Sequence, residues 1–257
     1  MCGIVGYIGH EQAQPILLEG LSRLEYRGYD SAGIAVMDGG RISLMKAKGR
    51  LANLEERLNG APLHGCIGIG HTRWATHGEP SDLNAHPHTD MKGDIAIVHN
   101  GIIENHESLR ASLIQQGCAF VSQTDTEVVA HLLNQLWDGS MLSTLRRAMA
   151  MLEGSYALCV ISAREPGVLY CTRKDSPLVV GLSDGAQYVA SDIPANTEVP
   201  LPRDCFAKKG DVEDLAETIA THLASDKPND YSSIIHEYYD WDKIAEQTAV
   251  VYRELAK

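Results

Sequence analysis

Residues 2–8 read Cys2-Gly3-Ile4-Val5-Gly6-Tyr7-Ile8 and place a cysteine directly before a short apolar run rich in β-branched residues. Such a run predicts a buried strand over residues 3–8. Removal of Met1, which is common before a small residue, would give Cys2 both a thiol and a free α-amine. That amine has a reference pKa of about 8 and is able to act as the base that activates the thiol. The alternative is a small packing residue at the start of a strand, because cysteine is often buried.

Hydrophobic periodicity predicts the other elements outward from this strand. The expected strands cover residues 32–37, 42–45, 66–71, 95–99, 156–162, 168–172, 178–182 and 187–191, and the expected helices cover 12–24, 107–116, 126–137 and 142–152. Residues 73–90 have no period and are expected to form a long loop, which in a compact domain is usually functional or mobile. Strands followed by helices and again by strands favour a layered α+β fold.

Composition excludes several function classes. The 257 residues include 22 basic and 34 acidic side chains, and the net charge of −12 disfavours general binding to nucleic acid or to an anionic membrane. No apolar run approaches the roughly 20 residues that span a bilayer, and no signal peptide is recognisable. The six cysteines are scattered without a Cys-x-x-Cys pair, so we expect free thiols and a cytoplasmic location.

Three polar positions are candidates for chemistry. In His99-Asn100-Gly101, the Asn100 side chain and the Gly101 backbone N–H are two donors able to converge on an oxyanion, although Asn-Gly is also a common turn dipeptide. Arg73 is suited to clamping a carboxylate with two hydrogen bonds. Asp125 precedes a predicted helix, where it could cap the helix, hold a substrate ammonium, or do both.

Several histidines lie on the loop that follows Arg73, which raises the question of a metal site. They are not spaced at i, i+4 on a helix, and no glutamate or cysteine completes a zinc-binding pattern. We therefore expect no metal, and the sequence suggests no cofactor.

Taken in order, five motifs closely resemble the glutaminase domain of the glucosamine-6-phosphate synthase branch of the class II, N-terminal-nucleophile glutamine amidotransferases. The motifs are Cys-Gly-Ile-Val-Gly at residues 2–6, Tyr-Arg-Gly-Tyr-Asp-Ser-Ala-Gly at 26–33, His-Thr-Arg-Trp-Ala-Thr-His-Gly at 71–78, Asn-Ala-His-Pro-His at 84–88, and His-Asn-Gly-Ile-Ile-Glu-Asn at 99–105. The resemblance covers residues 1–195 and implies a four-layer αββα sandwich of the N-terminal-nucleophile hydrolase type with a helical C-terminal tail.

The resemblance also implies residue roles. Cys2 would be the nucleophile, Asn100 and Gly101 would form the oxyanion hole, and Arg27 would help hold the N-terminus near the nucleophile. The implied substrate-binding residues, which would hold or cover glutamine, are Arg73, Trp74, Thr76, His77, His86 and Asp125. The implied activity is hydrolysis of L-glutamine to glutamate and ammonia for amino-sugar synthesis, with fructose 6-phosphate as the acceptor in the full enzyme.

The last part of the chain departs from that family. We expect residues 196–257 to form a linker and two amphipathic helices, over 211–224 and 241–255, and the tail weakly resembles the C-terminal end of family 4 GT-B glycosyltransferases. Thirteen of its residues are acidic and seven are basic. The simpler interpretation is that these two helices pack on the sandwich or on a neighbouring protein.

Two classes of function remain open from the sequence. The first is an amidotransferase that supplies ammonia to a sugar-phosphate isomerase domain, or to another ammonia-accepting enzyme, outside this chain. The second is a glutamine-sensing or assembly module that binds a partner through the acidic tail. An amidase for another substrate fits less well, because Arg73 and Asp125 together suit a free amino acid. Homodimerisation is left open.

Overall fold

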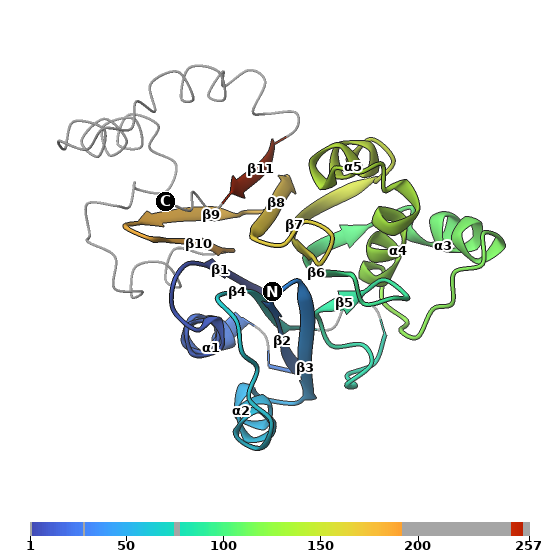
Figure 1. The fold of residues 1–257 in the computed structure, drawn as a ribbon. Helices are drawn as coiled ribbons and strands as arrows, with labels where there is room; N and C mark the ends of the chain where they lie inside the picture. Colours follow the sequence, from blue (N-terminus) through green and yellow to red (C-terminus); the bar gives the residue numbers. More distant parts are fainter. Residues whose placement is uncertain (1, 28, 75–77, 192–247, 254–257) are drawn as a thin grey trace, which may run out of the picture.

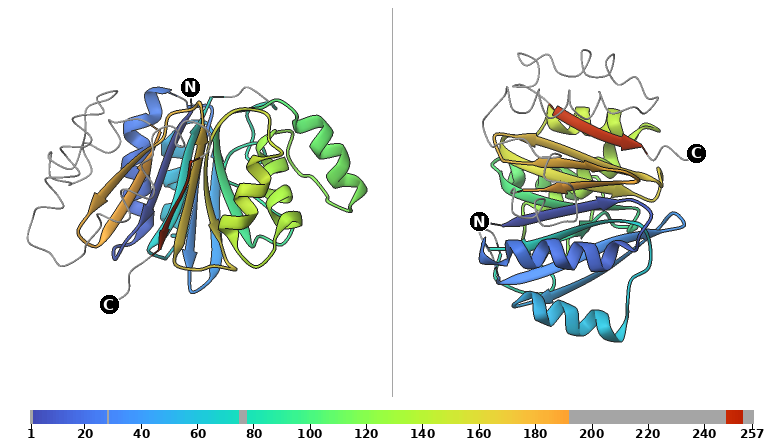
Figure 2. Two further views of the ribbon diagram at one scale, coloured as in Figure 1. Left: turned by 90° about the horizontal axis from the view of Figure 1, so that it is seen from above. Right: turned by 90° about the vertical axis from the view of Figure 1, so that its left-hand side faces the viewer.

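The computed structural model describes residues 2–27, 29–74, 78–191 and 248–253. Within this part of the chain, two antiparallel sheets lie face to face, and helices cover both outer faces (Figures 1 and 2). The expected four-layer αββα sandwich is confirmed.

The first sheet has the strand order β3-β2-β4-β1-β10-β9. Its strands are β1 (Gly3–Ile8), β2 (Ser31–Asp38), β3 (Arg41–Lys48), β4 (Ile67–Arg73), β9 (Val179–Ser183) and β10 (Ala186–Ala190). The second sheet has the order β11-β8-β7-β6-β5. Its strands are β5 (His88–Thr89), β6 (Ile95–Ile103), β7 (Gly154–Ser162), β8 (Val168–Lys174) and β11 (Thr248–Arg253).

The helices divide between the two faces, as the left view of Figure 2 shows. On the first sheet lie α1 (Ala13–Leu24) and α2 (Leu51–Gly60), and a 3-10 turn, η1 (Glu25–Arg27), follows α1. On the second sheet lie α4 (Thr126–Leu136) and α5 (Met141–Met149), and α3 (His106–Gln115) packs against α4. None of the helices in the described part of the chain is long and apolar enough to cross a membrane.

The apolar pattern explains the layers. All six residues of β1 are buried, because this strand is covered on both faces. In α1, the side chains of Leu17, Leu21 and Leu24 are completely buried against the first sheet, and each such burial stabilises the fold by about 2 kcal/mol. A separate cluster that includes Ile4 and Val98 fills the space between the sheets, which holds β1 and β6 together.

The expected elements are largely confirmed, and the differences have local causes. The helix α2 was not predicted, although Leu51, Leu54 and Leu58 recur at helical spacing and are buried. Within the predicted loop, His88–Thr89 forms the short strand β5.

The C-terminal tail differs from expectation where it is described. A helix over residues 241–255 is wrong for Thr248–Arg253, which forms β11 and pairs antiparallel with β8. The segment Thr-Ala-Val-Val-Tyr-Arg is rich in β-branched residues, and β8 offers it the unpaired backbone groups of an edge strand. The predicted linker and the helix over 211–224 lie outside the described residues.

Candidate active site

Cys2 lies directly before β1, and its thiol contacts the backbone of Trp74. The N–H of Trp74 lies 3.3 Å from Sγ, and the thiol lies 3.5 Å from the Trp74 carbonyl oxygen. Burial raises the pKa of the thiol, against the hydrogen bond from Trp74. Since the thiolate is the reactive form, this thiol needs a nearby base to react near neutral pH.

Asn100 reaches Cys2 from the opposite sheet. Its Nδ2 donates a hydrogen bond of 3.1 Å to the carbonyl oxygen of Cys2. An amide nitrogen carries two hydrogens, so a second donor remains beside the nucleophile. The strand β6 is buried as far as His99, and the chain then emerges at Asn100 and Gly101, which brings the two candidate oxyanion donors to the end of the sandwich.

Gly101 occupies a position where no side chain fits. Its φ is +120°, and a Cβ at this residue would lie 2.0 Å from the carbonyl oxygen of Ser155 on the paired strand β7. A glycine is therefore required for β6 to turn its backbone at the residue after Asn100.

Arg73 ends β4 with its side chain buried. Nη2 donates a hydrogen bond of 2.9 Å to the carbonyl of Gly78, and Nη1 lies 4.0 Å from Oδ1 of Asp30. The guanidinium is thus held against Gly78, in the described part of the loop that follows β4. A buried cation in such a place is suited to binding a carboxylate.

The segment just before Asp125 packs against the same loop at Gly78. Gly78 packs so closely against Gln123 that a Cβ at Gly78 would lie 3.1 Å from the Cβ of Gln123. Oδ2 of Asp125 accepts a hydrogen bond of 2.9 Å from the N–H of Ile103, at the end of β6. Arg73, Asp125 and the end of β6 therefore approach one region. The predicted helix cap is wrong: the Asp125 side chain makes no capping hydrogen bond, because it is turned to β6.

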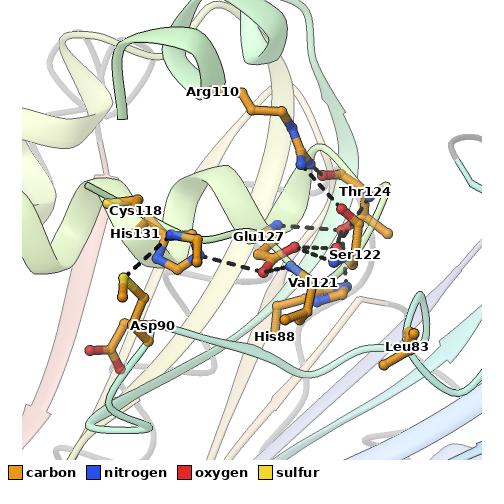
Figure 3. Close-up of polar contacts among 12 residues, drawn as sticks. Leu83, His88, Asp90, Arg110, Cys118, Val121, Ser122, Thr124, Glu127 and His131 are labelled. Atoms are coloured by element: carbon orange, nitrogen blue, oxygen red, sulfur yellow. Dashed lines mark hydrogen bonds and ion pairs between the residues drawn. The ribbon is translucent and has the colours of Figure 1, made fainter. Parts of the chain in front are cut away.

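The segment before Asp125 is held by a buried carboxylate, Glu127, which Figure 3 shows. Oε1 accepts from the N–H of Val121 at 2.8 Å, and Oε2 accepts from the N–H of Ser122 at 2.7 Å. Burial raises the pKa of Glu127, but hydrogen bonds from His131, Ser122 and Val121 outweigh it and lower the pKa to about 2. Arg110 donates to the carbonyls of Ser122 and Thr124. This network makes the approach to Asp125 rigid.

Four buried histidines lie behind the candidate donors of β6. Their positions are His71 on β4, His86 in the loop, His88 on β5 and His99 on β6. The rings of His71 and His86 stack with centroids 4.2 Å apart. Among the described residues, no group of three or more histidine, cysteine, aspartate or glutamate side chains is arranged to hold a metal ion.

The structure describes the side chains of only some of the remaining predicted site residues. Trp74 is 49% exposed, and its ring lies edge-on to Tyr29 with centroids 5.4 Å apart. His86 is buried behind Asn100, where its ring stacks on His71. Arg27 ends η1, but its side chain is not described, and Thr76 and His77 lie outside the described residues.

Two residues of the site were given no role in the sequence analysis. His71 lies 2.9 Å from Asn100 (Nε2 to Oδ1), and the amide of Asn84 joins the loop to Gln123. Both lie within quoted motifs, but buried polar side chains that contact one another across strands leave no periodic signal in the sequence.

The chain is similar to known proteins over most of its length. The glutamine amidotransferase domain family matches residues 71–197. The glutamine–fructose-6-phosphate aminotransferase (isomerizing) of Clostridium acetobutylicum is 55% identical over 195 residues, which are 76% of this chain and 32% of that protein. The Clostridium tetani protein of the same name is 57% identical over 195 residues, which are again 76% of this chain and 32% of that protein. The chain thus spans about a third of the length of the curated relatives that it matches.

Solved structures show the same fold. Glutamine phosphoribosylpyrophosphate amidotransferase from B. subtilis, complexed with ADP and GMP, aligns with a TM-score of 0.67 and 30% identity over 76% of this chain and 42% of that one. The allosteric regulatory enzyme of purine biosynthesis aligns with a TM-score of 0.68 and 30% identity over 76% of this chain and 42% of that one.

The two stacked sheets, with a cysteine before the central strand β1, define an N-terminal-nucleophile hydrolase fold. Within that class, the N-terminal part of the chain is similar to class II glutaminase domains: residues 71–197 match the glutamine amidotransferase domain family, and the matched curated relatives are glutamine–fructose-6-phosphate aminotransferases.

Proposed function

We propose that the chain hydrolyses L-glutamine to glutamate and ammonia, with the thiol of Cys2 as the nucleophile. The observation that carries this proposal is the contact of 3.1 Å between the Asn100 amide and the Cys2 carbonyl. A neutral donor of one sheet next to the residue that carries the thiol in the other supports the proposal, because attack on an amide carbonyl needs both a nucleophile and an oxyanion donor.

The reaction begins with proton transfer. Removal of Met1 frees the α-amine of Cys2, which accepts the thiol proton; the N–H of Trp74, 3.3 Å from Sγ, stabilises the thiolate. Sγ then bonds to the side-chain carbonyl carbon of glutamine, and the carbonyl oxygen becomes an oxyanion. The second Nδ2 hydrogen of Asn100 and the N–H of Gly101 stabilise that oxyanion, each by about 3 kcal/mol.

Collapse of the tetrahedral species breaks the carbon–nitrogen bond. The protonated amine of Cys2 returns its proton to the leaving nitrogen, so ammonia departs and a γ-glutamyl thioester remains. Water, deprotonated by the same amine, hydrolyses the thioester to glutamate and the free thiol. No cofactor takes part in these steps.

Recognition of glutamine requires one group of each charge. Arg73 is suited to the α-carboxylate and Asp125 to the α-ammonium, since both are buried close to the same loop. Thr76, His77 and the exposed ring of Trp74 would cover the bound amino acid, and His86 supports the site from behind. Arg27 follows α1 and would help hold the N-terminus.

The names of the relatives suggest the destination of the ammonia. We propose that it is delivered to a sugar-phosphate isomerase domain that carries fructose 6-phosphate, or to another ammonia-accepting enzyme, outside this chain. The part over residues 1–195 would be the glutaminase unit, and 196–257 the tail. No disulfide joins the five cysteines of the described residues, and we propose a cytoplasmic location.

The test is ammonia release from L-glutamine by the purified 257-residue protein, with intact mass measured on the same sample to report removal of Met1. Parallel assays use glutaramic acid, which lacks the α-ammonium, and 4-aminobutanamide, which lacks the α-carboxylate. We expect turnover of glutamine alone. Binding of glutamine without ammonia release by processed protein would indicate a sensing module, and turnover of all three amides would indicate a different amidase.

A further inference from the structure

Asn100 is held from behind by one neighbour, His71. The imidazole Nε2 of His71 lies 2.9 Å from Oδ1 of Asn100, and on the other side the Asn100 Nδ2 faces Cys2. The amide therefore lies between an imidazole of the first sheet and the nucleophile residue, and its two ends face different partners.

The protonation of His71 decides which end of that amide faces which partner. Burial lowers the pKa of His71 to about 3, against a hydrogen bond with Asn100 that raises it, so the ring is neutral near pH 7 and carries one N–H. An amide oxygen only accepts hydrogen bonds, so the hydrogen is on Nε2. Nδ1 is buried and has no hydrogen-bond partner among the described residues.

The opposite tautomer would reverse the amide. A bare Nε2 would accept from Nδ2 of Asn100, and Oδ1 would then face the carbonyl oxygen of Cys2. Two oxygens would oppose each other, and the site would offer an acceptor where an oxyanion requires a donor. The direction of Asn100 thus depends on an N–H at Nε2 of His71.

The ring of His71 has little freedom to move. It is completely buried and stacks on His86 at 4.2 Å with an interplanar angle of 26°. His86 is fixed in turn, since a Cβ on Gly33 would lie 2.2 Å from its carbonyl oxygen. The backbone at residue 86 therefore packs directly on β2, and Nδ1 of its ring lies 3.4 Å from the N–H of His99.

We propose that His71 is a positioning residue that acts through Asn100: its Nε2–H holds the amide so that Nδ2 faces the carbonyl oxygen that becomes the oxyanion. The inference rests on the proposed glutaminase function and on Asn100 as an oxyanion donor. In this role, His71 itself makes no contact with glutamine.

The experiment measures kcat and KM for glutamine in two variants of the full chain. His71→Phe keeps an aromatic ring for the stack with His86 and removes the donor. His71→Gln restores a donor, because its Nε2 reaches about as far along the side chain as the imidazole Nε2. We expect His71→Phe to lower kcat by on the order of tenfold or more while KM changes less than about threefold. His71→Gln should recover most of the loss.

A double-mutant cycle with Asn100→Ala shows whether His71 acts through that residue. If it does, adding His71→Phe to Asn100→Ala costs little further activity, since the amide to be directed is already gone. Losses that multiply would overturn the proposal, as would a His71→Phe enzyme with wild-type kcat. The control for loss of a buried aromatic hydrogen-bonding group is Tyr7→Phe, which removes a hydroxyl that accepts a hydrogen bond from the N–H of Glu11, and which should lower stability without lowering kcat.

The outcomes separate this inference from the proposed function. A wild-type protein, processed at Met1, that releases no ammonia would contradict the proposed function itself. An active wild type with an impaired Asn100→Ala and an unimpaired His71→Phe would contradict only the role of His71. Thermal unfolding of each variant confirms that folded proteins are compared.

Discussion

Cys2 and Asn100 are separated by 98 positions in the sequence and joined by a hydrogen bond of 3.1 Å between the Asn100 Nδ2 and the Cys2 carbonyl oxygen. Cys2 precedes β1 of the first sheet, and Asn100 lies on β6 of the second. The contact therefore crosses the sandwich, and the site exists only where the two sheets meet at one end.

Substitution of the nucleophile should remove activity and leave the fold intact. We expect Cys2→Ala to abolish glutamine hydrolysis, because Cys2 supplies the thiol, and to remain folded, because the side chain is partly exposed. Cys2→Ser should be nearly as inactive, since a hydroxyl is far less acidic than a thiol. Ammonia release and circular dichroism test both points. Residual turnover above about a hundredth of wild type, in protein free of contaminating glutaminase, would contradict the assignment.

Asn100 and Arg73 should differ in the kinetic parameter that they control. Asn100→Ala should lower kcat by about a hundredfold or more with a smaller effect on KM, because an oxyanion donor acts mainly in the transition state. Arg73→Ala should chiefly raise KM, since a carboxylate clamp acts in both the ground state and the transition state. Initial rates over a range of glutamine concentrations measure both parameters.

The Arg73 variant needs a control for folding, because its guanidinium also contacts Gly78 and Asp30. Arg73→Lys keeps the charge and loses the two-pronged geometry, so its KM should lie between those of the wild type and Arg73→Ala. If Asn100→Ala changed mainly KM and Arg73→Ala mainly kcat, the two roles would be assigned the wrong way round.

Activity should require removal of Met1. While Met1 is attached, the nitrogen of Cys2 is an amide and is not basic, so the thiol, whose pKa is raised by burial, lacks its base. We expect a loss of roughly 10² to 10⁴ in rate. The comparison is between processed protein and a form in which a bulky residue inserted after Met1 blocks its removal, with intact mass to confirm each state. Equal activity in both forms would exclude the amine from the mechanism.

The buried histidines should make the fold sensitive to mild acid. Burial lowers the pKa of His71 to about 3 and also lowers the pKa values of His86 and His88. Between pH 3 and about 6.5, the unfolded chain therefore binds a proton at His71 that the folded chain does not, and stability falls as the pH falls. For His71 alone the loss between pH 7.5 and 5 is on the order of 2 kcal/mol. Urea unfolding across this range measures it.

A carboxylate provides the control for that pH window. The pKa of Glu127 is lowered to about 2, so its stabilising contribution is complete above about pH 4.5 and is lost only as the pH falls from there toward 2. His71→Phe should reduce the slope of stability against pH between 7.5 and 5, whereas Glu127→Gln should leave that slope unchanged and lower stability throughout. A wild-type slope of zero above pH 5 would contradict the prediction.

Local sequence was sufficient for most of the elements, because strands and helices are specified by the spacing of apolar residues that face a core. The run at residues 3–8 was predicted as a strand and is one, and the helix over 12–24 was placed to within a residue. The error at residues 248–253 has a tertiary cause. The sequence of an apolar segment does not show which element it will pair with, so the same residues also fit one face of a helix. Pairing with the edge of β8 makes this segment a strand.

The sequence by itself determined which residue types the site contains, since the quoted motifs include Cys2, Arg73, Asn100 and Asp125. Only the tertiary structure decided their relations: that Asn100 faces Cys2 across the two sheets, that Asp125 is turned to β6 and caps no helix, and that His71 holds the far end of the Asn100 amide. The reason is physical. Hydrophobic patterning specifies which face of each strand is buried, whereas a hydrogen bond between strands of different sheets depends on how the sheets stack and at what register, and neither leaves a local signal in the chain.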